Sequence, residues 1–185
     1  EQLMTEYGKI DLLFCDYTSK YKDGTDYFDR DRILEMVYRC QPEIIVNDRL
    51  AYSKDGVRDF DYYTPEICVM NAPPVVKGNE VIWESCTTMN DHWGYYSGDN
   101  NYKDAHSLIS ALMGCVSKSG NMLLNVGPDA DGSIGETAEQ RLQEIAGWYK
   151  INGRAVYGCS RSQYTAPYGC CYTQNGNKIY CFLLI

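Results

Sequence analysis

The chain has 185 residues, of which 44% are hydrophobic and 23% charged, and its formal net charge is −8. This length allows one domain or part of a larger fold, and the composition is that of a globular protein rather than a disordered one. The acidic balance argues against a nucleic-acid partner, because a phosphate backbone needs a basic face. No apolar run reaches about 18 residues, so we expect neither a transmembrane helix nor a membrane partner.

The cysteine pattern gives no sign of a metal site. None of the nine cysteines forms a C-x-x-C pair, and we expect mostly free thiols, no metal and no cofactor.

The 17 tyrosines and three tryptophans are a stronger signal of function than the cysteines. Aromatic rings with a polar edge suit stacking on sugars, although packing within a core explains them equally well.

The first apolar run ends in a carboxylate. Residues 10–16 predict a strand buried on both faces, as in a parallel sheet covered by helices, with Asp16 at its carboxyl end. Ligands bind at that end of such sheets, so Asp16 is a candidate site residue. The alternative is that Asp16 caps a helix or pairs with an arginine.

A helix and a second strand follow this first strand. Asp29 can cap a helix over residues 30–40, and residues 43–46 form a short apolar run that ends in Asn47-Asp48-Arg49. Strand, helix and strand within some forty residues predict a βαβ unit with parallel strands.

The alternation continues along the chain. We expect strands at 81–86, 122–126 and 155–157, and helices at 104–118, ending at Gly120, and at 136–152. Residues 87–101 form a loop rich in glycine and aromatic residues. A hairpin is expected to pair residues 163–173 with 178–184 around Asn175-Gly176.

This order predicts an α/β fold. We assign residues 1–159 to the C-terminal part of a (β/α)₈ TIM-like barrel and residues 160–185 to the first hairpin of an antiparallel, β-sandwich-like domain. An open doubly wound sheet is the competing architecture, but no G-x-G-x-x-G or P-loop supports nucleotide binding. The chain starts without methionine and stops within an apolar run, which predicts a fragment.

Three carboxylates adjoin apolar strand sequence: Asp16, Glu66 and Glu84. Retaining glycoside hydrolysis needs two carboxyl groups about 5–5.5 Å apart, one ionised as nucleophile and one protonated as acid/base. Strand ends of one barrel can supply such a pair. The alternative is that these carboxylates have only structural roles.

Several segments, in order, resemble glycoside hydrolase family 29, the alpha-L-fucosidases. They are Val46-Asn47-Asp48-Arg49, Trp83-Glu84 with Trp93-Gly94-Tyr95, residues 120–128 (Gly-Asn-Met-Leu-Leu-Asn-Val-Gly-Pro), and Gly147-Trp148 to Gly153 followed by Val156-Tyr157-Gly158. The resemblance covers roughly residues 3–160 and implies the second half of that family's catalytic barrel.

By position, the resemblance implies that Asp16 is the nucleophile and Glu66 the acid/base, with Glu84 as the alternative acid/base because the family does not keep this residue in one place. It implies Arg49 and Trp93 as sugar-pocket residues. The implied activity is removal of terminal alpha-L-fucose from a fucosylated oligosaccharide or glycoconjugate by double displacement. The family often acts outside the cytoplasm, whereas this chain shows no export signal.

Alternatives to these roles remain open. Glu84 could be a paired carboxylate that holds a loop, and Arg49 could pair with Asp48 or with Asp16. His92 and His106 are assigned no role.

The chain departs from the family pattern in two ways. Phe14 and Tyr17 stand near the implied nucleophile where the family has other residues, and the family's first barrel strands are missing. We therefore expect little activity from the isolated chain. The rival functions are a non-catalytic carbohydrate-binding or degenerate barrel protein, and a hydrolase acting on other sugars.

Overall fold

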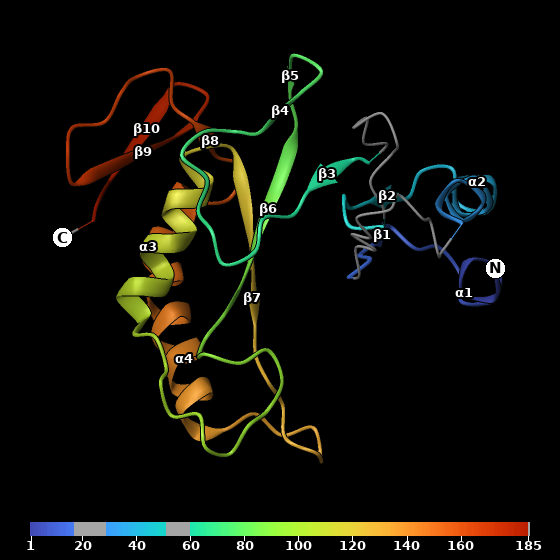
Figure 1. The fold of residues 1–185 in the computed structure, drawn as a ribbon. Helices are drawn as coiled ribbons and strands as arrows, with labels where there is room; N and C mark the ends of the chain where they lie inside the picture. Colours follow the sequence, from blue (N-terminus) through green and yellow to red (C-terminus); the bar gives the residue numbers. More distant parts are fainter. Residues whose placement is uncertain (17–28, 51–59, 185) are drawn as a thin grey trace, which may run out of the picture. The chain divides into compact units, whose positions relative to one another are not determined.

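The computed structural model describes residues 1–16, 29–50 and 60–184 (Figure 1). Tyr17, which departs from the family pattern, lies outside these ranges. The chain divides into two compact units, Glu1–Thr64 and Pro65–Ile185. No helix in the described ranges is long and apolar enough to cross a bilayer.

The first unit contains a parallel βαβ arrangement, as the sequence predicts. Its elements are α1 (Gln2–Glu6), β1 (Leu12–Leu13), α2 (Arg30–Cys40), β2 (Ile45–Val46) and β3 (Tyr62–Tyr63). β1 pairs in parallel with β2, with Leu13 opposite Val46. The core of the unit is formed by α1, α2 and the residues around β2, and its buried members are Met4, Leu34, Val37, Ile44 and Val46.

The prediction of a first strand buried on both faces is wrong. Leu13 packs against the core, but its neighbour Leu12 is exposed, as is Ile45 opposite it. In this unit the described helices cover only one face of the β1–β2 pair. The strand is also shorter than expected, because the side chain of Asn47 takes over the pairing at Cys15.

Asp29 occupies the N-cap position of α2, as predicted, but does not cap the helix with its side chain. Its backbone is left-handed, with φ of 50°, and its carboxylate makes no capping hydrogen bond.

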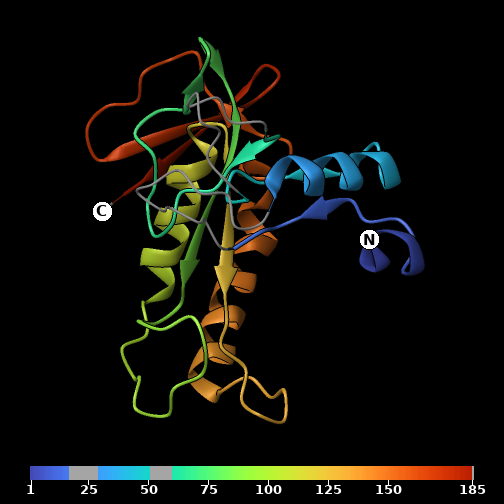
Figure 2. The ribbon, with the colours of Figure 1, turned by 45° about the vertical axis from the view of Figure 1, so that its right-hand side comes forward.

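The second unit is built around two parallel strands and the helix between them. Its elements are β4 (Val75–Val76), β5 (Asn79–Glu80), β6 (Ile82–Thr88), α3 (Ala105–Val116), β7 (Gly120–Asn125), α4 (Glu136–Asn152), the 3₁₀ turn η1 (Gly153–Ala155), β8 (Ser160–Arg161), β9 (Cys170–Asn175) and β10 (Lys178–Leu183). β6 and β7 pair in parallel. Helices α3 and α4 run side by side along the β6–β7 pair (Figures 1 and 2).

Local sequence signals set the helices of this unit. The Asp104 carboxylate accepts a hydrogen bond from the backbone N–H of Ser107 at 2.6 Å, which caps α3. The bounds of α4 agree with the predicted range of 136–152.

One predicted helix end and one predicted strand are wrong. Ser119 rather than Gly120 adopts the left-handed conformation after α3, with φ of 58°, and Gly120 begins β7. Residues 155–157 do not form a strand, because Gly153 keeps helical dihedral angles and the chain continues from α4 into η1.

The C-terminal strands form an antiparallel sheet in the order β10-β9-β8. The predicted hairpin forms, but Asn175 pairs with Lys178, so the two turn residues are Gly176, with φ of 55°, and Asn177 rather than Asn175 and Gly176. Cys171 of β9 packs with Ile109 and Met113 of α3, so this sheet shares a core with the helices.

These strands confirm a mixed α/β fold with an antiparallel C-terminal sheet. The described strands do not close a barrel. The assignment to a (β/α)₈ barrel and the domain boundary near residue 160 stay predictions.

Candidate active site

Asp16 follows a segment that is fixed by one buried side chain. The backbone N–H of Cys15 donates to Asn47 Oδ1 at 2.8 Å, and Asn47 Nδ2 donates to the Cys15 carbonyl at 2.9 Å. Asn47 is almost fully buried. The Asn47 amide makes the two hydrogen bonds that the backbone of a neighbouring strand would make, so the position of the backbone immediately before Asp16 is fixed.

Arg49 holds the Asp16 carboxylate. Its Nη1 lies 2.8 Å from Asp16 Oδ1, and the guanidinium also donates from Nε to Thr64 Oγ1 at 2.9 Å and from Nη2 to the Thr64 carbonyl at 3.1 Å. The Arg49 side chain is 13% exposed, whereas that of Asp16 is 80% exposed. The arginine is thus anchored in the protein and presents one N–H to an accessible carboxylate. A charge-assisted hydrogen bond of this kind stabilises a negative carboxylate.

Asp48 supports Arg49 indirectly. Its Oδ1 accepts from the backbone N–H of Thr64 at 2.9 Å and from Thr64 Oγ1 at 2.6 Å. The Thr64 hydroxyl donates its hydrogen to Asp48, and its oxygen accepts a hydrogen bond from Arg49 Nε. The sequence left open whether Arg49 pairs with Asp48 or Asp16, and the structure shows the pair with Asp16. The role of Thr64 was not predicted from the sequence.

The two acid/base candidates lie in the second unit. Glu66 is exposed and its backbone forms a parallel bridge with Cys86 of β6. Glu84 lies within β6, and partial burial raises the pKa of its carboxyl group above the ordinary value. A raised pKa favours the protonated form, which an acid catalyst needs.

Strand alternation defines the face on which Glu84 lies. Leu124 packs against the cluster of α3 and α4, and it is paired with Thr87. Because successive side chains point to opposite faces, Thr87 lies on the helix-covered face and Glu84 on the other face. In a barrel, the face opposite the helices is the interior.

The two candidates differ in their position along β6. Glu84 precedes the last residue of the strand, Thr88, by four residues, or about 13 Å of extended chain. Glu66 is level with Cys86 and is therefore closer to the carboxyl end, where barrel enzymes place their chemistry. The position along β6 favours Glu66 as the acid/base, whereas the raised pKa of its carboxyl group favours Glu84.

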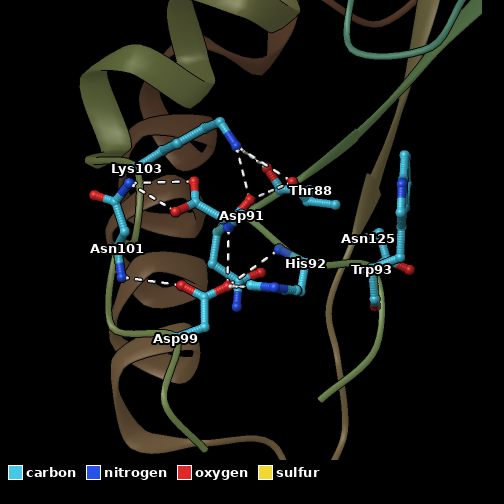
Figure 3. Close-up of polar contacts among 9 residues, drawn as sticks. Thr88, Asp91, His92, Trp93, Asp99, Asn101, Lys103 and Asn125 are labelled. Carbon is cyan, nitrogen blue, oxygen red and sulfur yellow. Dashed lines mark hydrogen bonds and ion pairs between the residues drawn. The ribbon is translucent and has the colours of Figure 1, made fainter. Parts of the chain in front are cut away.

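Trp93 lies on the loop that leaves the carboxyl end of β6. This residue is 39% exposed, and its carbonyl accepts a hydrogen bond from Asn125 Nδ2, at the end of β7, at 2.7 Å (Figure 3). The predicted sugar-pocket tryptophan is therefore accessible and attached to the neighbouring strand.

His92, which is assigned no role from the sequence, is in contact with Asp99 of the same loop. His92 Nδ1 lies 2.7 Å from Asp99 Oδ2. The spacing of these residues within a polar loop carries no periodic signal, so the contact could not be found from the sequence.

The predicted residues thus form two groups. Asp16 and Arg49 are in contact in the first unit, and Glu66, Glu84 and Trp93 belong to the second. Among the described residues, no three His, Cys, Asp or Glu side chains are grouped so that they could hold a metal ion.

Comparison with known proteins identifies the family. Residues 1–154 match the family model described as Alpha-L-fucosidase. The tissue alpha-L-fucosidase of Bos taurus is 30% identical over 186 aligned residues, which cover 95% of this chain and 38% of the bovine protein.

Solved structures give the same result. Alpha-L-fucosidase isoenzyme 1 from Paenibacillus thiaminolyticus is 35% identical, with a TM-score of 0.87 over 96% of this chain and 43% of the bacterial one. A GH29 alpha-L-fucosidase from Bacteroides thetaiotaomicron, solved as a trapped covalent intermediate with 2-fluoro-fucosyl fluoride, is 25% identical, with a TM-score of 0.69 over 80% of this chain and 37% of that one.

The chain spans less than half the length of each of these relatives. The match nevertheless runs through most of the chain and includes both units. The chain therefore belongs to the alpha-L-fucosidase family, glycoside hydrolase family 29.

Proposed function

We propose that the whole protein is a retaining alpha-L-fucosidase that removes terminal alpha-L-fucose from oligosaccharides or glycoconjugates by double displacement. The observation that carries this proposal is the carboxylate of Asp16, which lies three residues after β1, is accessible and is bonded to the anchored guanidinium of Arg49. The Bacteroides relative, trapped as a covalent intermediate with a fluorinated fucosyl fluoride, supports a covalent mechanism.

In the first step the Asp16 carboxylate attacks the anomeric carbon of fucose. The bond to the leaving oxygen breaks, and the protonated acid/base gives that oxygen its proton. In the second step the deprotonated acid/base takes a proton from water, whose oxygen attacks the anomeric carbon and releases Asp16. Arg49 keeps the carboxylate oriented, and Trp93 stacks on the apolar face of the sugar.

The acid/base is Glu66 or Glu84. We assign the role first to Glu66, because it lies nearer the carboxyl end of β6. Glu84 is the alternative, supported by its raised pKa.

The isolated chain is expected to have little activity. Its nucleophile is 80% exposed, so water is not excluded from the reacting carboxylate. The relatives use more than twice this length of chain. In the whole protein we place residues 1–159 in the catalytic barrel and residues 160–185 at the start of a β-domain.

Hydrolysis of an aryl alpha-L-fucoside by the whole protein tests the function. We expect Asp16→Asn to lower kcat by about 10³-fold or more, because the nucleophile is lost, while the sugar still binds. Asp11→Asn is the matched control, since Asp11 is an exposed aspartate on the same segment. A carbohydrate-binding protein would instead bind fucose without turnover in either form. A panel of other aryl glycosides would reveal a different hydrolase.

A further inference from the structure

A single buried carboxylate organises the loop that carries Trp93, which we define as the tryptophan loop, residues 89–103. Asp99 Oδ2 accepts from the backbone N–H groups of Asp91 at 3.0 Å and His92 at 3.1 Å, and Asp99 Oδ1 accepts from Asn101 N–H at 3.1 Å (Figure 3). The Asp99 side chain is only 2% exposed. Its oxygens therefore satisfy backbone donors from both sides of the loop.

The fourth contact of Asp99 fixes the residue next to Trp93. His92 Nδ1 lies 2.7 Å from Asp99 Oδ2, and this hydrogen bond is the main cause of the lowered pKa of Asp99. An ionised carboxylate only accepts, so the imidazole donates from Nδ1. The His92 ring also packs edge-on against Tyr96, with the ring centroids 5.1 Å apart. Both the backbone and the side chain of His92 are thus held.

Trp93 itself is held from the other direction. Its carbonyl accepts from Asn125 Nδ2, and the following peptide lies against Gly127, where an added Cβ would come within 3.0 Å of Gly94 C and Tyr95 N. In Figure 3 Trp93 lies beside Asn125, apart from the contacts around Asp99. The indole is left partly exposed while the backbone on both sides is fixed.

The base of the loop is closed by a third group of contacts. Lys103 N–H donates to the Met89 carbonyl at 2.8 Å. The Lys103 ammonium donates to the carbonyls of Thr88 at 2.8 Å and Asn90 at 3.1 Å. The tryptophan loop is therefore a preformed element at the carboxyl end of β6 and β7. The side chains of Asp99 and Lys103 are hydrogen-bonded to backbone groups of the loop and of Thr88.

We propose that Asp99 is a positioning residue for sugar binding, which acts by holding the backbone of the tryptophan loop so that the Trp93 indole faces the substrate. This inference rests on the proposed function for the identity of the sugar. Asp99 itself does not touch the substrate. Its carboxylate determines the position of the indole. Because the indole is already in place, less conformational entropy is lost when the sugar binds.

A double-mutant cycle in the whole protein tests this proposal. We expect Asp99→Asn and Trp93→Ala each to raise KM for an aryl alpha-L-fucoside about tenfold, with kcat changed by less than about threefold, because a lost stacking contact weakens binding on this scale. The double variant should be no worse than Trp93→Ala alone, since both changes remove the same contact. Asp104→Asn is the control, because its Oδ1 can still cap α3 and KM should stay within about twofold.

The cycle has two outcomes that overturn the proposal. One is a KM of Asp99→Asn equal to that of the unaltered protein. The other is a pair of effects that multiply in the double variant, which would show that Asp99 acts independently of Trp93. If Asp99→Asn does not fold, His92→Phe replaces it, because it removes the contact of Asp99 with the residue next to Trp93 but keeps a ring at that position, and it must give the same non-additive rise in KM.

Binding separates this inference from the proposed function. If the unaltered protein binds L-fucose in a calorimetric titration but releases none from the aryl fucoside, the hydrolase function fails, and the same cycle is measured on the dissociation constant. If L-fucose binds equally well to the protein with and without Trp93, the inference fails whether or not hydrolysis is seen.

Discussion

At the scale of single residues, buried polar side chains hold the backbone at points where strands have ended. The Asn47 amide pairs with both backbone groups of Cys15 immediately before Asp16, and the Asp99 carboxylate binds three backbone N–H groups around Trp93. A buried polar atom without a hydrogen-bond partner lowers the free energy of unfolding by about 1–3 kcal/mol, so these side chains stabilise the fold only while their hydrogen bonds are made. Each of these side chains therefore links local stability to the position of a proposed site residue.

Asn47→Ala should lower both stability and kcat. The change leaves the N–H and carbonyl of Cys15 without their partners and is expected to reduce the free energy of unfolding by about 1–3 kcal/mol. Because a displacement of about 1 Å can reduce a rate about 10²-fold, kcat should fall more than KM rises. Denaturant unfolding and fucoside kinetics of the whole protein measure the two effects. The exposed Asn177→Ala is the control, and an unchanged kcat in Asn47→Ala would refute this role.

Glu84 should make stability depend on pH. Burial raises the pKa of its carboxyl group in the folded state, so folding favours the protonated form. That contribution is fully present below the ordinary pKa and is lost as pH rises through the raised one. Glu84→Gln, which cannot ionise, should therefore melt at a higher temperature than the unaltered protein at pH 7, and the difference should close towards pH 4. The exposed Glu35→Gln should show no such trend, and a constant difference for Glu84→Gln would be the contrary result.

At the scale of elements, the pairing of β6 with β7 depends on a glycine. Trp83 of β6 is fully buried, and its Nε1 donates to the Lys118 carbonyl at 3.1 Å. It is paired with Gly120, where an added Cβ would lie 2.2 Å from the indole carbon Cε2. The glycine is thus needed for space rather than as the helix end that the sequence predicted.

Gly120→Ala should destabilise the second unit by about 3 kcal/mol, because overpacking displaces a buried aromatic ring. Gly147→Ala is a matched control in α4, where an added Cβ meets nothing within 4 Å and should stabilise the helix by about 0.5–1 kcal/mol. Thermal or denaturant unfolding measures both. Equal stability of the two variants would show that Trp83 can move aside without cost.

The elements show which features of the fold are predictable from local sequence. The range of α4 agrees with the prediction, and the parallel pairing of β1 with β2 followed from the βαβ pattern. The exposure of Leu12 was not predicted, because it depends on which elements cover a strand and not on the strand itself. The strand predicted at residues 155–157 was wrong because this apolar triplet is equally compatible with a strand and with the turn that follows η1.

At the scale of the whole molecule, the chain belongs to the alpha-L-fucosidase family, and the catalytic roles of its residues are proposals. Ordered motifs through most of the chain pointed to the family, and the family model match confirms it. The sequence also placed Asp16 at a strand end, but the Thr64 bridge to Arg49 and the contacts of Asp99 depend on side-chain directions that no spacing rule supplies. The site residues named from the sequence stay proposals, and the structure shows which contacts hold them.

The most direct test is to identify the residue that becomes bonded to the sugar. The whole protein is incubated with 2-fluoro-fucosyl fluoride, the reagent used to trap the Bacteroides relative, then digested with protease and analysed by mass spectrometry. We predict that the fluorofucosyl group is attached to the carboxylate of Asp16 and that Asp16→Asn prevents labelling. Labelling of another residue, or fucoside hydrolysis by the Asp16→Asn protein at the unaltered rate, would contradict the assignment of Asp16 as the nucleophile.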